Sequence, residues 1–244
     1  MSEARCPAVA LDEDFHVHST FSDGASTPAE NVRAARERAL RTLCLVDHVR
    51  RDTTWLPEFT AAVAPLRGQP GLRVLAGVEA KILDASGRLD LPSDLDGIDL
   101  VLIADHQFPG KDGPVHPAQA RATIDGGRMT AAEAIELLCE ATASAPNATD
   151  RSCVLAHLFS VLPKMGLDEA MVPEPLLAKL ARRVADTGAM VEINEKWACP
   201  SARTVDAMAR AGVTVVAGSD SHHCRDIGVY RSVELTAGAG ARPA

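Results

Sequence analysis

The sequence predicts an α/β fold in a single domain: a barrel in which parallel strands alternate with helices. Seven short apolar segments recur along the chain, as expected for parallel strands that are covered on both faces. Helical patterns lie between them, and strand–helix alternation of this kind is typical of βα barrels. No linker or short-period repeat divides the 244 residues. A doubly wound open sheet shows the same alternation and is the alternative.

The expected strands are short runs rich in Val, Leu, Ile and Ala. Aromatic residues make up only 3% of the chain, so the core must be built mainly from these aliphatic side chains. In chain order, we expect strands at Asp14–His18, Thr42–Asp47, Arg73–Val78, Leu100–Ala104, Cys153–His157, Met190–Asn194 and Thr214–Gly218.

The expected helices are marked by start signals and by apolar spacing. Capping boxes, in which a Thr and a Glu three residues later satisfy each other's backbone amides, begin at Thr27 and Thr130. The first of these helices has proline at its first position and is expected to end near Arg41. Apolar residues recur at helical spacing over 55–66, with Trp55 in the core, over 176–184, and after Ser201, which is expected to cap the last helix.

One connection is unusually long for a βα loop. The polar stretch 107–129 contains Lys111, His116, Arg121 and Arg128. A loop of this length is often functional, for example as a lid, and the alternative is a disordered surface insertion. We expect the barrel to occupy residues 12–235, with loose tails at 1–11 and 236–244.

Composition limits the class of protein. The formal net charge of −8 favours solubility and argues against a nucleic-acid or membrane surface, although a small basic pocket for an anion remains compatible with it. The six cysteines form no CxxC pair and predict no disulfide framework. We find no signal-peptide pattern and no apolar run near the roughly 20 residues that span a bilayer. A cytoplasmic location is therefore expected.

Histidines and carboxylates gather at the ends of the expected strands. Residues two apart on a strand face the same side, so both members of the pairs His16/His18 and Asp220/His222 can point into a barrel. A lone histidine of this kind is more often a hydrogen-bonded rim residue. Nine donors in one pocket would be costly without cations to neutralise and ligate them. We therefore expect a cluster of divalent metal ions held by His16, His18, Asp23, His48, Glu79, His106, His157, Asp220 and His222.

These residues stand in an order that resembles the PHP (polymerase and histidinol phosphatase) family. The family's first motif is similar to Asp14-Phe15-His16-Val17-His18-Ser19 followed by Ser22-Asp23-Gly24, and its second to Asp47-His48. Its third-motif histidine corresponds to His157, and its last motif to Ser219-Asp220-Ser221-His222. The resemblance extends from Asp14 to His222 and implies a distorted (β/α)7 TIM-like barrel.

The resemblance also implies two or three divalent metal ions, of zinc, manganese or iron. Asp23 stands where other members carry either histidine or aspartate, and His223 is expected to be a neighbour rather than a ligand. The implied ligands of the three positions are, in order, His16, His18, Glu79 and Asp220; Glu79, His106 and His157; and Asp23, His48 and His222.

The expected activity is metal-dependent hydrolysis of a small phosphomonoester by a metal-bridging hydroxide, as in histidinol phosphatase. The expected catalytic residues are Glu79, Asp220 and His222. Trp197 could stack on a substrate ring or simply pack at the rim. Cationic side chains in the βα loops could bind the phosphate, or could be only solvated. They are Arg225 and Lys196, which are favoured because they lie close to strand ends, and Arg50, Lys81 and Lys164.

Three other functions use a similar constellation. The first is a phosphodiesterase or nuclease acting on a nucleotide or a small diester, which the acidic charge disfavours where nucleic acid is the substrate. The second is an amidohydrolase, since those barrels also open with a His-x-His pair but usually have eight strands and a bridging modified lysine. The third is a metal-dependent binding module without activity.

Overall fold

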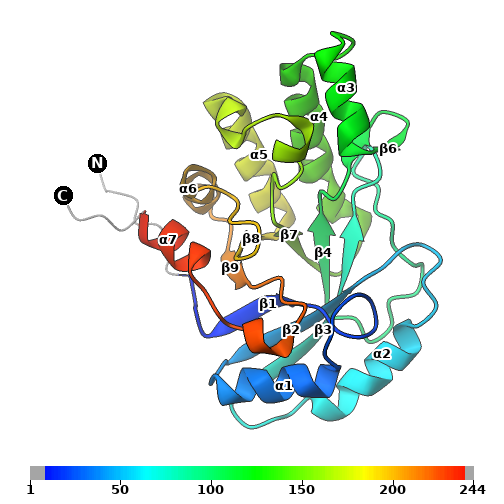
Figure 1. Cartoon of the computed structure of the whole chain (residues 1–244), viewed down its shortest axis with the longest axis vertical. Coiled ribbons are helices and arrows are strands. Elements are labelled where there is room, and N and C mark those ends of the chain that lie inside the picture. Colours follow the sequence, from blue (N-terminus) through cyan, green and yellow to red (C-terminus); the bar gives the residue numbers. More distant parts are fainter. Residues whose placement is uncertain (1–8, 240–244) are drawn as a thin grey trace.

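The computed structural model of the protein describes residues 9–239, and its core is a sheet of seven parallel strands (Figure 1). All seven expected strands are present, with ends that differ by up to three residues. Spatial order follows chain order, so the sheet has no switch point and the doubly wound alternative is wrong. The strands are β1 (Glu13–Val17), β2 (Thr42–His48), β3 (Arg73–Lys81), β4 (Leu100–Ala104), β7 (Ser152–Ala156), β8 (Met190–Asn194) and β9 (Val215–Gly218).

The first and last strands nearly close the sheet into a barrel. Just beyond β9, Ser221 forms a parallel bridge with Val17 of β1. The amide of His18 donates to the Ser221 carbonyl (2.9 Å), and the Ser221 amide donates to the His16 carbonyl (3.2 Å). This closure places the His16/His18 motif of β1 beside the Asp220/His222 motif that follows β9.

Strand alternation divides the barrel interior into an apolar part and a polar part. Cys44 and Val46 of β2 and Leu75 of β3 belong to a small apolar cluster contributed by alternate strand residues. Further along the same strands, His48 and Glu79 lie opposite each other in the sheet register. Because side chains two apart share a face, these two groups point inward at the carboxyl end of the barrel, above the apolar cluster.

A β-bulge adjusts the first strand. The pairing of β1 with β2 shifts between Asp14 and Val17. Bulges bend a strand and redirect side chains. Phe15 accordingly joins the inner apolar cluster, whereas its neighbour His16 is buried among the polar groups. The bulge makes the barrel irregular at the strand that carries two of the expected ligands.

Helices cover the outside of the sheet, where a larger apolar cluster lies between the two layers. In Figure 1, α1 and α2 lie beneath β1–β3, while α4 and α5 flank the other end of the sheet. Short 3₁₀ turns follow α2, α4, β7 and β9, among them η3 (Pro163–Met165) and η5 (Cys224–Asp226). The helices are α1 (Pro28–Glu37), α2 (Leu56–Val63), α3 (Pro117–Asp125), α4 (Ala131–Ser144), α5 (Glu174–Thr187), α6 (Ala202–Arg210) and α7 (Ser232–Ala239).

The end of one expected helix and the cap of another differ from expectation. The first helix ends at Glu37 rather than near Arg41, because Ala39 adopts a left-handed conformation (φ 56°) and the Leu40 amide turns back to the Ala35 carbonyl. Ser201 precedes α6 but makes no side-chain cap; its hydroxyl donates to Glu169 instead.

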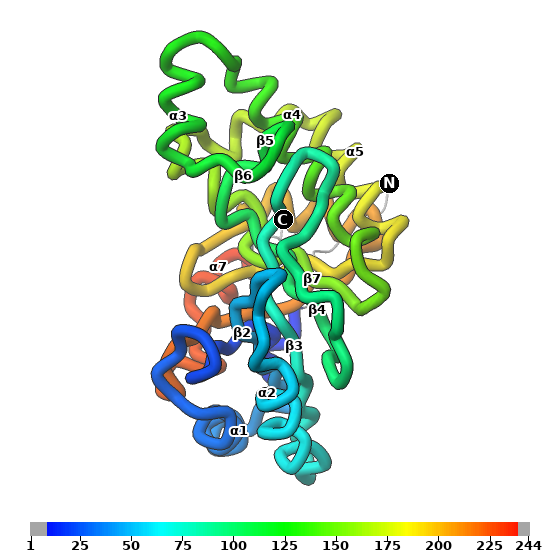
Figure 2. Tube along the Cα trace, turned by 90° about the vertical axis from the view of Figure 1, so that its right-hand side faces the viewer, coloured from blue at the N-terminus to red at the C-terminus, as the bar shows by residue number. Residues whose placement is uncertain are grey.

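The long connection after β4 is ordered, so the disordered-insertion alternative is wrong. It forms an antiparallel hairpin, β5 (Phe108–Gly110) and β6 (Gly113–Val115), which leads into α3. Figure 2 shows this segment at the end of the molecule away from α1 and α2.

The expected tails are only partly visible. Residues 1–8 and 240–244 lie outside the described residues. Residues 236–239, expected to belong to a loose tail, form the end of α7 instead. Among the helices within residues 9–239, none is both long and apolar enough to cross a bilayer.

The second capping box offers a stability prediction. The Thr130 hydroxyl accepts from the Glu133 amide (3.2 Å), and the Glu133 carboxylate accepts from the Thr130 amide (2.7 Å). We expect Thr130→Ala to lower the free energy of unfolding by about 1 kcal/mol in chemical denaturation, since it leaves a first-turn amide without its acceptor. Thr130→Ser keeps the hydroxyl and is the matched control. An unchanged midpoint for the alanine variant would contradict this role.

Candidate metal centre

All nine expected ligands meet at the carboxyl end of the barrel. The first group joins β1 to the segment after β9. The Nε2 atoms of His16 and His18 lie 3.0 Å apart, and His18 Nε2 lies 3.5 Å from Asp220 Oδ1. Glu79 Oε2 lies 3.6 Å from both imidazole Nε2 atoms. The four residues expected at the first metal position are therefore adjacent.

Glu79 occupies the centre of the second group. Its Oε1 lies 3.1 Å from His106 Nε2 and 3.0 Å from His157 Nε2. Its Oε2 lies 2.8 Å from His48 Nδ1. The two carboxylate oxygens thus face different sets of imidazoles, which is the arrangement that a bridging carboxylate requires.

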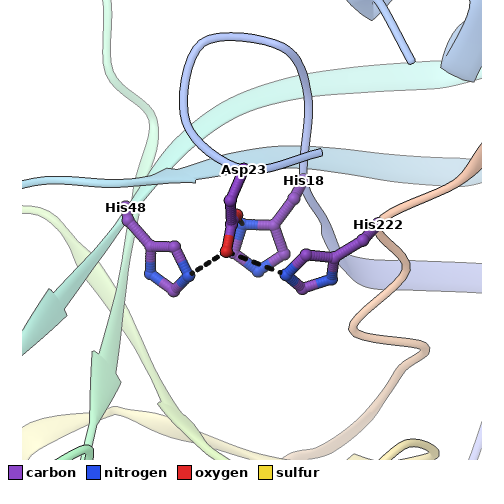
Figure 3. Close-up of side chains that lie close together, drawn as sticks. All are labelled: His18, Asp23, His48 and His222. Carbon is purple, nitrogen blue, oxygen red and sulfur yellow. Dashed lines mark hydrogen bonds and ion pairs between the residues drawn. The ribbon is translucent and has the colours of Figure 1, made fainter. Parts of the chain in front are cut away.

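The third group is more open and is drawn in Figure 3. Asp23 Oδ2 lies 3.4 Å from His48 Nε2 and 3.3 Å from His222 Nε2, and Asp23 Oδ1 lies 3.7 Å from His18 Nδ1. The Asp23 side chain is 53% exposed. It projects from the loop after β1, toward three imidazoles that come from three separate segments of the chain.

Asp47 anchors that loop. Its carboxylate accepts from the amide and hydroxyl of Ser19 (2.9 and 2.6 Å) and from the amide of Ser22 (3.1 Å). Asp47 is fully buried beside His48, so a single dipeptide supplies one expected ligand and the support for another, Asp23. The sequence motif identified Asp47 without revealing this structural role.

Imidazoles shared between groups limit how metals can be distributed. His48 faces Glu79 through Nδ1 and Asp23 through Nε2. In a neutral imidazole one ring nitrogen carries a proton and only the other has a free lone pair, so the ring can bind a metal through only one nitrogen. Placing His48 at the third position, as the family resemblance implies, uses Nε2 and leaves Nδ1–H to donate toward Glu79.

Unsatisfied buried atoms test whether metals fit. His18 Nδ1 is buried and makes no hydrogen bond, and the buried Glu79 Oε2 faces three ring nitrogens, of which only His48 Nδ1 is within hydrogen-bond distance. Leaving such atoms unpaired is costly. Imidazole nitrogen and carboxylate oxygen are the donors that zinc and other first-row metals use, and donors on one tetrahedral ion are about 3.3 Å apart. The donor set and its spacing therefore fit divalent cations.

The carboxylates of the centre are ionised. Burial raises the pKa of Glu79, but the neighbouring His106 and His16 outweigh it and hold the pKa well below its ordinary value. Burial likewise opposes ionisation of Asp220, and His16 and His18 lower the pKa of that carboxyl below its usual range. Both groups are thus available as anionic ligands near neutral pH.

Glu192, which the sequence analysis missed, supports two of the histidines. It lies in the middle of β8 and is fully buried. Its Oε1 accepts from His16 Nδ1–H (2.9 Å), and its Oε2 accepts from the His157 amide (2.7 Å) and from Asn194 Nδ2 (3.1 Å). A carboxylate of this kind fixes the tautomer and orientation of a ligating imidazole. The available signal was a charged residue in the middle of a buried strand.

Asp105 supports the opposite side of the centre. Its Oδ1 accepts from the Ser160 hydroxyl (2.6 Å) and lies 3.4 Å from His157 Nδ1. The other ring nitrogen of His157 faces Glu79. Like Glu192, Asp105 therefore holds an expected ligand in place without belonging to the donor groups themselves.

The expected phosphate-binding cations differ in position. Lys196 Nζ lies 3.2 Å from Asp220 Oδ1 and 3.3 Å from His222 Nδ1, so it contacts the donor groups directly. Arg50, Lys81 and Lys164 line an adjoining cavity of about 660 Å³ that opens on His48, Glu79 and His106. Arg225 is not among the residues that line this cavity; its side chain is 74% exposed and pairs with Asp226.

Trp197 lies at the rim of the centre. Its indole Nε1–H donates to Asp220 Oδ2 (2.9 Å), and Lys164 Nζ lies 4.0 Å from the centroid of its ring. The side chain is 42% exposed. Both polar contacts tie the indole to the site, and one face of it carries a cation.

Comparisons with known proteins agree with this geometry. The PHP domain family model matches residues 14–196. A probable phosphatase of Vibrio cholerae serotype O1 (strain M66-2) is 35% identical over 129 residues, 50% of this chain and 51% of that protein. The chain thus matches about half the length of that relative. A probable phosphatase of Aliivibrio fischeri (strain MJ11) is 27% identical over 240 residues, 92% of this chain and 83% of that protein.

The fold also matches a solved structure. Histidinol phosphate phosphatase from Lactococcus lactis, complexed with zinc, L-histidinol and phosphate, superimposes with a TM-score of 0.65. The match covers 95% of this chain and 94% of that one, at 17% sequence identity. At this identity the likeness is one of fold.

Proposed function

Since the chain belongs to the PHP domain family, we propose that it is a metal-dependent phosphatase that hydrolyses small phosphomonoesters. The observation that carries the proposal is the convergence of nine donors around Glu79 at the carboxyl end of the barrel. The names of the relatives from Vibrio cholerae and Aliivibrio fischeri support the same activity. Glu79 occupies the place where an amidohydrolase often has a modified lysine, and the sheet has seven strands rather than eight.

Two or three divalent ions would be held by the three donor groups. The ions would lower the pKa of water and neutralise charge on the phosphoryl oxygens. Glu79 would bridge the first two positions, since its oxygens face separate imidazoles. Asp220 and His222 would serve the first and third positions, on the side where Lys196 lies. We assign the catalytic roles to Glu79, Asp220 and His222 on this basis.

The chain's own residues would orient the phosphate and keep the ligands rigid. The Lys196 ammonium group lies next to Asp220 and His222 and can donate to a phosphoryl oxygen placed between them. Glu192 and Asp105 hold His16 and His157 from behind. Because these supporting groups are buried, the donor atoms are preorganised before substrate arrives.

Metal analysis combined with a substrate panel tests the proposal. We expect the purified protein to contain zinc, manganese or iron and to release phosphate from at least one small phosphomonoester. Chelation should abolish turnover and added metal should restore it, because water ionisation depends on the ions. Bis(p-nitrophenyl) phosphate in the same panel separates a monoesterase from the diesterase alternative. Absence of turnover with every metal and every ester would refute the proposal.

A further inference from the structure

A cavity next to the metal centre has room for the leaving group of a substrate. It measures about 660 Å³ and opens directly on His48, Glu79 and His106. Pockets for small organic ligands measure roughly 300–1,000 Å³, whereas a phosphoryl group alone fills only a small part of such a volume. When the phosphoryl group lies at the donors, this cavity can receive the alcohol to which it is esterified.

The charge of the cavity wall is the reverse of the charge of the whole chain. The chain has 33 acidic and 25 basic side chains. Apart from Glu79, which faces the donors, the charged residues that line the described cavity are Arg50, Lys81 and Lys164. They come from three separate elements: the loop after β2, the end of β3, and η3. A wall assembled from three basic residues is complementary to an anion.

Contacts hold two of these cations in place, and one of the two is paired with a carboxylate. Lys164 rests on the Trp197 ring, with Nζ 4.0 Å from the centroid, and that ring leaves the ammonium charge uncompensated. Lys81 Nζ lies 3.1 Å from Asp90 Oδ2. The other Asp90 oxygen accepts from the Arg51 amide (2.9 Å), so Asp90, which is not among the cavity-lining residues, holds Lys81 in place and offsets part of its charge. Arg50 and Lys164 therefore supply most of the uncompensated positive charge of the wall.

Arg50 is the best placed to bind an oxyanion. It is exposed, lines the cavity, and follows His48 by two residues. Its amide donates to the Thr53 hydroxyl (2.8 Å), which fixes the backbone from which the side chain projects. A guanidinium group can grip a carboxylate or phosphate through two parallel hydrogen bonds.

We propose that the substrate carries a second anionic group, a carboxylate or a phosphate, that binds Arg50, Lys81 and Lys164 while the scissile phosphoryl group lies at the metal centre. This inference rests on the proposed phosphatase function. It selects acidic phosphomonoesters over neutral ones, and it disfavours amino-alcohol phosphates, whose ammonium group would lie among three cations.

Binding of matched phosphonates tests the inference independently of turnover. We would titrate the metal-loaded protein calorimetrically with 3-phosphonopropionate, propylphosphonate and 3-aminopropylphosphonate, and confirm the metal content afterwards. The carboxylate analogue should bind at least about tenfold more tightly than the neutral one, since charge-assisted hydrogen bonds add that much. The ammonium analogue should bind most weakly. 1,3-Propylenebisphosphonate in place of the carboxylate analogue distinguishes a phosphate-binding site from a carboxylate-binding one.

Variants assign the preference to the cavity. Arg50→Gln and Lys164→Gln should each reduce the ratio of carboxylate to neutral affinity, whereas Arg51→Gln, which alters the adjacent residue outside the lining, should keep it. Equal affinities for the three analogues, or tightest binding of the ammonium analogue, would overturn the inference. If the protein hydrolyses propyl phosphate but binds the three analogues equally, the second anion site is refuted and the phosphatase function is not. A preference without any turnover supports the site and refutes the phosphatase.

Discussion

Replacing Glu79 with alanine should abolish hydrolysis and strip the centre of metal. Its two oxygens lie within 3.6 Å of nitrogens from five imidazoles: Oε1 faces His106 and His157, and Oε2 faces His16, His18 and His48. Without this carboxylate, the first two metal positions lose their common ligand. We expect kcat/KM to fall by at least about a thousandfold, a loss of roughly 4 kcal/mol of transition-state stabilisation, and bound metal to fall below that of the unaltered protein in elemental analysis.

Two further variants separate charge from shape in this test. Glu79→Gln keeps the size of the side chain but cannot bridge as an anion, so it should resemble the alanine variant in metal content. Glu58→Ala removes an exposed carboxylate from α2 and should change neither metal content nor turnover. Circular dichroism should show that all three variants keep the fold. Normal metal content and turnover in either Glu79 variant would remove Glu79 from its assigned role.

The strands and the donor set were readable from the sequence because both depend on local patterns. Apolar runs marked all seven strands, and the nine donors lay at or near strand ends, which a parallel barrel brings to one rim. Helix ends were less readable. Helix α1 ends where Ala39 adopts a left-handed conformation. A glycine at this position would have predicted the helix end, whereas an alanine does not.

Support for the donors was not readable because it depends on contacts between distant strands. Glu192 on β8 reaches His16 on β1, 176 residues away, and no sequence spacing encodes that pair. The hairpin in the long connection has a local turn signal: Pro109-Gly110 and Asp112-Gly113 are turn-forming dipeptides on the two sides of its bend. The phosphate-binding cations were predicted from their closeness to strand ends. That criterion succeeded for Lys196, which contacts the donor groups, but Arg225 does not line the adjoining cavity.

Gly218 gives a second prediction of large effect. A Cβ at this position on β9 would lie 1.7 Å from Glu192 Oε1 and 2.9 Å from His16 Cβ. Gly218→Ala must therefore displace the buried Glu192 carboxylate and break its bonds to His16 Nδ1 and the His157 amide. We expect the free energy of unfolding, measured with chelator present, to fall by about 2–4 kcal/mol. Metal affinity should fall by at least about tenfold, because both imidazoles lose their support.

A double-mutant cycle shows whether the effect passes through Glu192. Glu192→Ala removes the atoms nearest the new Cβ, so Gly218→Ala should cost at least about 1 kcal/mol less in that background than alone. Gly238→Ala, at an exposed position of α7 with open space around it, is the matched control and should be neutral or slightly stabilising. Additive costs would mean that the glycine is needed for β9 itself. Strong coupling would mean that glycine is required at position 218 because the Glu192 carboxylate occupies the space of a Cβ. The orientation of His16 would then depend on Gly218, although Gly218 has no side chain to contact it.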